Sequence, residues 1–354
     1  MSRKAVVLFS GGIDSLSSLI WAMKQYRKEN VTALYVDLGH RYAQKELKAA
    51  REITKRLGVN FEVVEAHFVG KKEKEDAPIP WRNLFLILTA CYFLPDEGGD
   101  IIIQNVQVGE TSIGDRTPEF NRATQELLSW IEGKRVKVIA PFADYTKGQI
   151  VRWLLDVGKV DLELIKLTVG CFSEEDGRCG KCPACFRLWI ACETAGIECR
   201  HWFNNDPVKW EGTKKYAEKM LRGEYDDRRV VETLTVLLKY GIIKGIVVVD
   251  LDEVLCKATP WWDYANAEPI RENIEKVNKL YDMGYGIWIH TSRFECDREV
   301  TEWWLREHGV KYHRLIMGKP WATHYIDDKN CLSLDEVLHH ALEKEKVEKE
   351  AQNR

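Results

Sequence analysis

Short apolar runs alternate with amphipathic stretches along the first part of the chain. The runs are rich in valine, isoleucine and leucine, as expected of strands buried in a sheet, and they lie at residues 4–9, 31–36, 61–64 and 101–103. Apolar residues recur at helical spacing elsewhere, at residues 16–24, 45–57, 84–92, 146–155 and 186–194. Strands alternating with helices predict an α/β fold whose parallel sheet is covered on both faces.

The pattern changes at residues 204–244, where polar and charged sequence with helical character replaces the alternation. A second strand–helix series follows. Its predicted strands are residues 245–249, 285–290 and 324–326, and its predicted helix is residues 299–307. We therefore expect a first domain at 1–203, a helical connector at 204–244, a second α/β domain at 245–338 and a charged helical tail at 339–354.

Length and composition agree with two domains. The chain has 354 residues, and one domain usually takes about 100–200. Apolar residues make up 45% of it, which argues against disorder, and a formal net charge of -3 provides no basic field for nucleic acid. No apolar run approaches the ~20 residues that span a bilayer, and no signal-peptide pattern opens the chain. We expect a cytoplasmic protein that does not bind a membrane, and direct nucleic-acid binding cannot be argued from this charge.

A glycine-rich loop follows the first predicted strand, where residues 10–15 read S-G-G-I-D-S. Between a strand and a helix N-terminus, glycines let the backbone approach an anion, and the free N–H groups point at it. The two serine hydroxyls add further donors. The loop therefore predicts a phosphate site, with a plain strand–turn–helix connection as the alternative. Its candidate binding residues are Ser10, Gly11, Gly12, Asp14 and Ser15.

Four of the ten cysteines crowd into one stretch with the spacing C-x7-C-x2-C-x2-C. In a reducing compartment such a cluster indicates metal binding before disulfide pairing, and four thiolates suit tetrahedral zinc. With every ligand supplied by protein, the zinc is expected to be structural; free loop cysteines are the alternative. The predicted ligands are Cys171, Cys179, Cys182 and Cys185. The remaining cysteines are expected to be small buried or partly buried residues: Cys91, Cys192, Cys199, Cys256, Cys296 and Cys331.

Two aspartates, Asp250 and Asp252, follow the first predicted strand of the second domain. Alternate residues at a strand end can converge on one Mg²⁺ and one phosphate. Hydroxyls, a lysine and a second acidic pair come later in the domain, which completes the residue types of a phosphoryl-transfer site. These further candidates are Thr291, Ser292, Lys319, Asp327 and Asp328.

Ordered motifs in the first domain resemble the 7-cyano-7-deazaguanine synthase (QueC) family. The S-G-G-x-D-S loop looks like its PP-loop. D-L-G-H-R at 37–41 is similar to the family's D-Y-G-Q-R-H, and P-W-R-N at 80–83 is similar to its P-G-R-N. P-F-A-D-Y-T-K-G-Q-I at 141–150 resembles its P-L…T-K-x-E-I, and the cysteines match its zinc loop. The resemblance implies a PP-loop ATPase fold, adenine nucleotide alpha-hydrolase-like, with a zinc loop.

The resemblance also implies a two-stage reaction. ATP adenylates the carboxylate of 7-carboxy-7-deazaguanine, ammonia displaces AMP to give an amide, and a second ATP dehydrates the amide to a nitrile. The PP-loop residues and Lys147 would bind ATP, and Mg²⁺ would assist at the phosphates. The implied substrate-binding residues are Arg41, Arg82, Asn83 and Asp115. For Arg41 above all, an ordinary ion pair is the alternative.

Residues 112–120 depart from the family's S-G-Y-P-D-C-R-x-E-F in a region where the substrate or the nucleophile is selected. Asp115, Glu119 and Phe120 match, whereas the Tyr-Pro and Cys-Arg pairs are lost. A conjugase of the kind encoded in anti-phage defence operons, which joins the activated deazaguanine to a protein amine, is therefore an alternative to the synthase. A nucleotide-binding scaffold is the third hypothesis, and the intact S-G-G-x-D-S and D-x-D motifs argue against it.

The second domain resembles the haloacid dehalogenase (HAD) superfamily of Rossmannoid α/β phosphatases, in its small, nearly capless members. By this resemblance Asp250 forms an aspartyl-phosphate and Asp252 is the general acid/base. Thr291 or Ser292, together with Lys319, would hold the phosphoryl oxygens. The implied Mg²⁺ ligands are Asp250, Asp252, Asp327 and Asp328. A degenerate HAD domain kept for binding is the alternative.

The sequence therefore predicts a QueC-like ATP-dependent ligase fused to a Mg²⁺-dependent HAD phosphohydrolase. ATP, structural Zn²⁺ and Mg²⁺ are the expected cofactors. The expected partner is 7-carboxy-7-deazaguanine, with a protein acceptor under the conjugase alternative, and a homodimer is left open.

Overall fold

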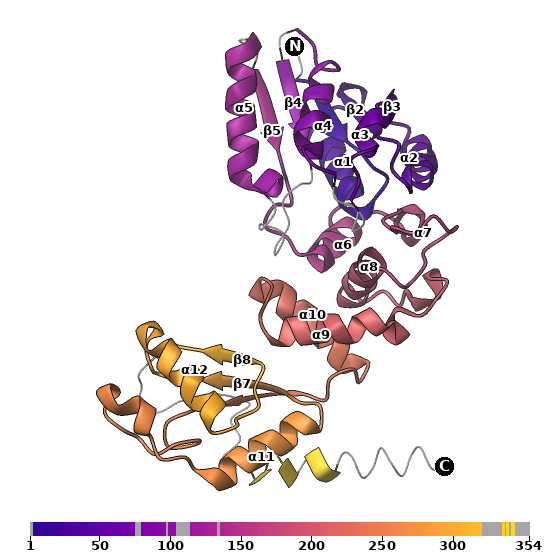
Figure 1. Ribbon diagram of the computed structural model, residues 1–354. Helices are drawn as coiled ribbons and strands as arrows, with labels where there is room; N and C mark the ends of the chain where they lie inside the picture. The colour runs from indigo at the N-terminus through magenta and orange to yellow at the C-terminus, as the bar shows by residue number, and fades with distance from the viewer. Residues whose placement is uncertain are drawn as a thin grey trace, which may run out of the picture. The chain divides into compact units, whose positions relative to one another are not determined.

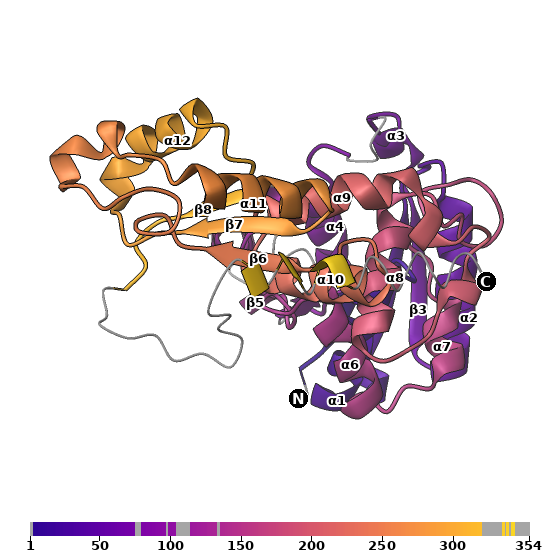
Figure 2. The same ribbon diagram turned by 90° about the horizontal axis from the view of Figure 1, so that it is seen from below.

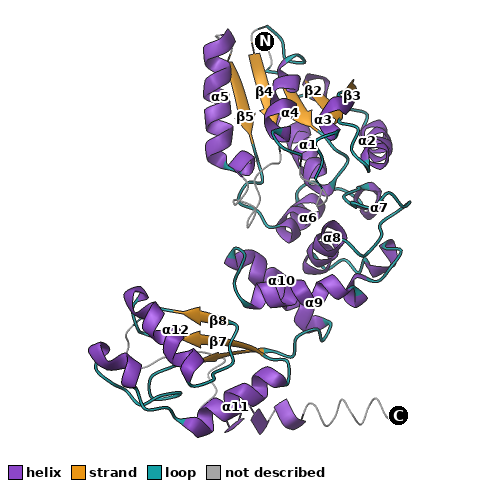
Figure 3. Cartoon of the chain, in the orientation of Figure 1, coloured by secondary structure: helices purple, strands orange, loops and turns teal. Residues whose placement is uncertain are grey.

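The computed structural model of the chain describes residues 3–74, 79–96, 98–103, 114–132, 135–320, 335–336, 338–339 and 341–343. It divides into two compact units, each with its own parallel sheet (Figures 1 and 3). The first unit comprises Met1–Lys215 and Tyr225–Val236, and the second comprises Tyr216–Glu224 and Leu237–Arg354.

A five-stranded parallel sheet forms the centre of the first unit, in the order β3-β2-β1-β4-β5. The strands are β1 (Ala5–Leu8), β2 (Val31–Asp37), β3 (Asn60–Glu65), β4 (Gly98–Ile102) and β5 (Arg135–Ile139). From β1 the chain runs outward through β2 to β3 and then crosses back to β4 and β5. The order therefore reverses between β1 and β4, and open α/β sheets bind ligands at the carboxyl ends of strands beside such a reversal.

The central strand β1 is buried on both faces, which confirms the predicted parallel α/β sheet. Val6 and Leu8 pack with Ile87 of α4 (Arg82–Cys91) in one apolar cluster. Ala5 and Val7 point to the opposite face and are equally buried. Because neither face meets water, apolar residues fill every position of the strand and appear as a continuous run in the sequence.

The helices predicted in this unit are confirmed to within three residues at their ends. They are α1 (Ile13–Gln25), α2 (Ala43–Leu57), α4, α6 (Lys147–Asp156) and α8 (Pro183–Thr194). The elements that the pattern did not predict are α3 (His67–Gly70), α5 (Pro118–Glu132), α7 (Leu162–Leu167) and β5. The edge strand β5 reads R-V-K-V-I, and its charged positions break the apolar run that marks a buried strand. None of the helices in the described part of the chain is long and apolar enough to cross a membrane.

Side-chain caps fix where two helices of the first unit begin. At α6, the Thr146 side chain accepts a hydrogen bond from Gln149 N at 3.2 Å, and Gln149 Oε1 accepts one from Thr146 N at 2.8 Å. This capping box places Lys147 at the first residue of the helix. At α8, Cys182 is the N-cap and its sulfur accepts from Cys185 N at 3.4 Å.

The second unit contains a three-stranded parallel sheet in the order β6-β7-β8 (Figure 2). Its elements are β6 (Ile246–Val249), α11 (Arg271–Asp282), β7 (Gly286–His290), α12 (Arg298–Glu307) and β8 (Arg314–Ile316). The predicted β6, β7 and α12 are confirmed, whereas α11 and β8 were not predicted. The strand predicted at 324–326 lies outside the described residues, as does the tail predicted at 339–354 apart from residues 339 and 341–343.

The polar segment at 204–244 is helical, as predicted, and forms α9 (Glu211–Leu221) and α10 (Asp227–Lys239). Each helix contributes residues to both units. Within the second unit, Trp288 Nε1 donates to Leu221 O at 2.8 Å. Within the first, Glu232 Oε1 accepts from Gly148 N at 3.1 Å, and burial raises the pKa of Glu232.

Two adjacent tryptophans of α12 provide a test of the second core. Trp304 is fully buried and its Nε1 donates to Ala267 O at 2.8 Å, whereas Trp303 is 41% exposed. We expect Trp304→Ala to lower the free energy of unfolding of the second unit by ~3–5 kcal/mol, because it leaves a large cavity and an unpaired carbonyl. Trp303→Ala, the matched control, should lower it by less than ~1 kcal/mol. Urea titration measures both, and equal effects would contradict this packing.

Candidate functional site

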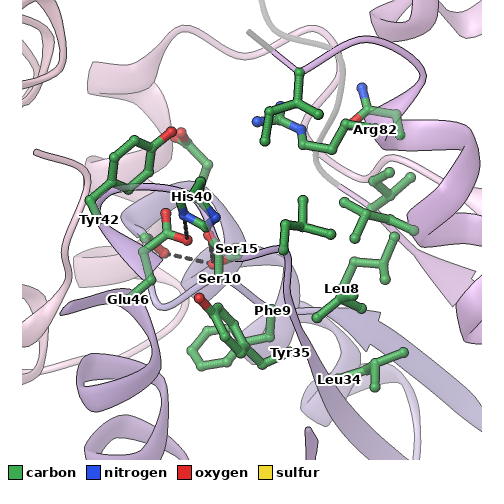
Figure 4. Close-up of a pocket in the computed structure, with 18 residues that line it drawn as sticks. Leu8, Phe9, Ser10, Ser15, Leu34, Tyr35, His40, Tyr42, Glu46 and Arg82 are labelled. Atoms are coloured by element: carbon green, nitrogen blue, oxygen red, sulfur yellow. Dashed lines mark hydrogen bonds and ion pairs between the residues drawn. The ribbon is translucent and has the colours of Figure 1, made fainter. Parts of the chain in front are cut away.

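A cavity of about 210 Å³ opens at the carboxyl ends of β1 and β2, beside Ile103, which follows β4 (Figure 4). It lies where the strand order reverses. Its polar lining comes from the loop after β1 and the first turn of α1, from β2 and the segment after it, and from the first turns of α2 and α4. These lining residues are Ser10, Gly12, Asp14, Ser15, Tyr35, His40, Tyr42, Glu46, Arg82 and Asn83.

The loop after β1 presents the N-terminus of α1 to this cavity. Gly12 is the N-cap residue, and because it has no side chain, the first N–H groups of the helix keep their capacity for a ligand. Ser15 Oγ donates to Gly12 O at 2.9 Å and lies 3.4 Å from Ser10 Oγ. Backbone donors and two hydroxyls therefore face one place, which suits an anion such as a phosphate.

Lys147 lies beside the glycine-rich loop at residues 10–15, which we call the phosphate loop, as the family resemblance predicted. Its Nζ forms an ion pair with Asp14 Oδ2 at 2.8 Å. The other oxygen, Asp14 Oδ1, is buried and has no hydrogen-bond partner within the described part of the chain. A cation and a partly unsatisfied carboxylate at a helix N-terminus form a polar site that can reorganise around a phosphate and its counter-ion.

The predicted substrate-binding residues divide into two groups. Arg82 and Asn83 open α4 and line the cavity. Asn83 Nδ2 donates to Asp115 O at 2.9 Å, so Asp115 contributes its backbone to this arrangement and its side chain is not among the lining groups described. Arg41 forms an ion pair with Glu73 at 3.0 Å, as the alternative to a substrate-binding role predicted. It is not among the residues that line the described cavity.

Sequence reasoning missed a buried His–Glu pair in the cavity wall. His40 Nε2 lies 3.0 Å from Glu46 Oε2, and the Tyr42 ring packs edge-on against the imidazole at 4.3 Å between centroids. Burial, with a smaller contribution from the Glu46 charge, raises the pKa of Tyr35 and of Tyr42, so both phenols stay protonated. The available signal was weak: a histidine six residues before a glutamate in the first turn of a predicted helix.

The four predicted cysteine ligands converge in the same unit. Their sulfur atoms all lie within 4.8 Å of one another, and Cys179 Sγ is 3.9 Å from Cys185 Sγ. Tetrahedral zinc with Zn–S bonds of ~2.3 Å sets sulfurs ~3.8 Å apart, so the cluster fits this metal. Hydrogen bonds from the thiols of Cys182 and Cys185 lower the pKa of Cys171, which favours its thiolate form.

The backbone around the cluster has the form of a metal knuckle. The sulfur of Cys171 accepts from Cys179 N, and that of Cys179 from Lys181 N, each at 3.3 Å. Gly180 has φ +73°, and a Cβ there would lie 1.7 Å from Asn205 O, so only glycine fits. These N–H···S bonds stabilise thiolates, which is what a structural zinc site requires.

The cysteines outside the cluster mostly follow the expectation. Cys192, Cys199 and Cys256 are buried and Cys91 is partly buried. Cys296 is exposed, contrary to the prediction, because it lies in the short 3-10 turn Glu295–Asp297 at the surface that leads into α12. Cys331 lies outside the described residues.

The second unit brings most of its predicted phosphoryl-transfer residues together. Asp250 follows β6, and Lys319 Nζ lies 2.7 Å from its Oδ2. Thr291 follows β7 and is fully buried; its hydroxyl donates to Asp252 Oδ2 at 3.4 Å, while Ser292 beside it is exposed. The second acidic pair, Asp327 and Asp328, lies outside the described residues.

Arg293 is a functional candidate that the sequence reasoning missed. It is 1% exposed, and its Nη2 and Nε reach the two oxygens of Asp252 at 2.7 and 3.1 Å. Its guanidinium lies 3.8 Å from the centre of the Tyr264 ring, and Nη1 donates to Thr301 Oγ1 at 3.3 Å. This bidentate pair holds the Asp252 carboxylate in one orientation. Only its place two residues after Thr291 could have drawn attention to it.

Loss of one cluster thiolate tests the metal assignment. We expect Cys179→Ser to reduce bound zinc well below one ion per chain, because a serine hydroxyl is a poor zinc ligand at neutral pH. If the zinc contributes ~3 kcal/mol, the midpoint of thermal unfolding falls by ~6–12 °C. Cys296→Ser, exposed and outside the cluster, is the control and should keep full zinc. Atomic emission measures the metal, and full occupancy in Cys179→Ser would contradict the assignment.

Comparison with known proteins identifies a family that matches the first unit. The family model described as "Queuosine biosynthesis protein QueC" matches residues 4–193, which is more than half of the chain. The 7-cyano-7-deazaguanine synthase of Pyrococcus furiosus is 32% identical over 224 residues, which cover 53% of this chain and 91% of that protein. The synthase of Cupriavidus taiwanensis is 32% identical over 238 residues, which cover 60% of this chain and 99% of the relative.

The matched region includes the phosphate loop, the cavity and all four clustered cysteines, whereas the D-x-D segment after β6 lies beyond residue 193. The resemblance that the sequence motifs suggested is confirmed for this region. The chain belongs to the QueC family.

Proposed function

We propose that the first unit is an ATP-dependent enzyme that adenylates 7-carboxy-7-deazaguanine and joins the activated acid to nitrogen, with 7-cyano-7-deazaguanine as the product. One observation carries this proposal. The phosphate loop opens into the same cavity as Arg82 and Asn83, inside the region that matches the QueC family. One cavity can therefore hold a nucleotide phosphate and an acid side by side.

The chemistry needs an activated carboxylate. A carboxylate is a poor electrophile, and transfer of AMP from ATP turns one of its oxygens into part of a leaving group. The N–H groups at the start of α1 and the Lys147 ammonium stabilise negative charge on the phosphates. Mg²⁺, where bound, supplies further charge stabilisation there. Arg82 is suited to pair with the carboxylate of the substrate or to form hydrogen bonds with its deazaguanine ring. Asn83 is held beside Arg82 by its hydrogen bond to Asp115 O.

Product mass tests the proposed reaction. The full chain, loaded with zinc, is incubated with ATP, ammonia and 7-carboxy-7-deazaguanine. We expect the nitrile together with AMP and pyrophosphate. If only the adenylate or the amide forms, and no nitrile appears until a protein acceptor is added, the result would favour the conjugase over the synthase. No turnover of ATP under any of these conditions would refute both enzymes and leave the scaffold.

For the second unit we propose a Mg²⁺-dependent phosphohydrolase with Asp250 as the nucleophile. Support comes from Lys319, whose ammonium lies 2.7 Å from Asp250, and from Arg293, which fixes the orientation of Asp252. Lys319 would hold a phosphoryl oxygen during attack by Asp250, and Asp252 would handle the proton of the leaving group. Asp327 and Asp328 remain predicted Mg²⁺ ligands.

Asp250→Asn tests this nucleophile. With para-nitrophenyl phosphate as substrate, we expect Mg²⁺-dependent phosphate release by the full chain to fall by ~10³-fold or more, because an amide does not form the aspartyl-phosphate. Asp282→Asn is the matched control, since Asp282 forms an exposed ion pair with Lys311 at 2.7 Å. Equal rates for Asp250→Asn and the control would remove Asp250 from the mechanism.

A further inference from the structure

His40 occupies an unusual position in the cavity wall. It follows β2, lines the cavity beside the phosphate loop, and is only 9% exposed (Figure 4). Its Nε2 atom lies 3.0 Å from Glu46 Oε2. Its other ring nitrogen, Nδ1, is buried and has no hydrogen-bond partner among the residues that the structure describes. A buried polar atom without a partner is unfavourable, so a ligand group is expected to meet it.

The position of Glu46 determines which ring nitrogen carries the proton. Glu46 lies in the first turn of α2, where the helix dipole stabilises a negative charge. An ionised carboxylate only accepts hydrogen bonds, so Nε2 of His40 is the donor in this pair. In the neutral imidazole Nδ1 then carries the lone pair. The dyad therefore has a base whose Nδ1 is buried and without a partner among the described residues, on a side chain that lines the cavity.

The other titratable groups of the lining are paired or protonated. Asp14 Oδ2 is paired with Lys147 at 2.8 Å, while its buried Oδ1 has no hydrogen-bond partner within the described residues, and Glu46 is engaged by His40 itself. The phenols of Tyr35 and Tyr42 are kept protonated by burial, and the Tyr35 hydroxyl donates to a backbone carbonyl. The remaining charged residue, Arg82, is a cation and takes up no proton.

A nitrogen nucleophile needs such a base. When an amine attacks an acyl adenylate, the nitrogen gains a positive charge and must lose a proton before the amide is stable. The QueC segment D-Y-G-Q-R-H has glutamine at the position of His40 and histidine at the position of Tyr42. The imidazole of this segment therefore lies two residues earlier in this chain than in the motif.

We propose that His40 is the general base for the nitrogen nucleophile, with Glu46 as its positioning partner; this rests on the proposed ligase function. The nitrogen forms a bond to the acyl carbon, the bond between that carbon and the AMP oxygen breaks, and the proton of the nitrogen passes to Nδ1 of His40. AMP leaves with the electron pair of the broken bond. The Glu46 carboxylate stabilises the imidazolium, and Tyr42, edge-on at 4.3 Å, keeps the ring in place.

The test separates adenylation from nitrogen transfer in the zinc-loaded full chain. Adenylation is measured as pyrophosphate exchange into ATP that depends on 7-carboxy-7-deazaguanine, and nitrogen transfer as amide formation with ammonia and a short peptide amine both offered. We expect His40→Gln to retain exchange and to lower amide formation by ~10²–10⁴-fold. Hydroxylamine, a strong nucleophile that is largely unprotonated at neutral pH, should restore product formation in this variant.

Two companion variants separate a chemical role from a structural one. Glu46→Gln keeps the shape of the pair without its charge, and we expect a smaller loss together with a shifted acidic limb in the pH–rate profile for amide formation. His67→Gln is the control: His67 is a nearby histidine whose side chain is 56% exposed, and it is not among the residues that line the cavity. Pyrophosphate exchange, amide formation and the reaction with hydroxylamine should all proceed at the wild-type rate in His67→Gln.

The outcomes identify which idea fails. A wild-type chain without acid-dependent exchange removes the proposed ligase function, and the role of His40 with it. A wild-type chain that exchanges and forms amide, with His40→Gln forming amide equally fast, overturns the role of His40 alone. Equal losses of exchange and amide formation in a His40→Gln protein with full zinc would make His40 a binding residue, which also overturns the proposal.

Discussion

The close approach of the phosphate loop to α2 is the constraint on which the candidate site depends. Gly11 has φ +75°, and a Cβ at this position would lie 2.9 Å from Ala50 N and 3.0 Å from Glu46 O. Only glycine permits this contact, because a side chain would meet backbone atoms that cannot move aside. The contact brings the start of α1 and the first turn of α2 to one cavity, so the anion site and the His40–Glu46 pair share a wall.

Residues that flank the first cluster cysteine contact the same wall. Val169 N donates to Gly11 O at 2.9 Å, two residues before the first cluster cysteine, Cys171. Phe172, which follows that cysteine, packs on Tyr42 at 5.5 Å between ring centroids, and Tyr42 packs on His40. A zinc ion held by the four sulfurs would therefore act at a distance, by fixing the segment that positions the loop and the base. In this way a closed metal site would contribute to the proposed reaction without taking part in its chemistry.

The pattern of apolar residues and the cysteine spacing predicted most strands and helices and the metal cluster. The features that they missed depend mainly on pairing between side chains far apart in the sequence. Continuous apolar runs predicted β1 and β2 because both faces of the sheet are covered, and fixed spacing predicted the four clustered cysteines. The pairing of Arg41 with Glu73 and of Arg293 with Asp252 joins residues 32 and 41 positions apart, which no periodicity reveals. The His40–Glu46 pair escaped for another reason: histidine and glutamate at this spacing are common, and only the burial of His40 makes them a candidate dyad.

Transfer of oxygen from the acid to AMP tests the central claim, which is that the cavity activates a carboxylate as an adenylate. The full chain is supplied with ATP, an amine and 7-carboxy-7-deazaguanine labelled with ¹⁸O in its carboxylate, and the AMP is analysed by mass spectrometry. The mechanism requires one labelled oxygen in the phosphate of AMP, because the oxygen that attacks phosphorus leaves the acyl carbon with it. AMP that forms in step with the product but carries no label would contradict the account.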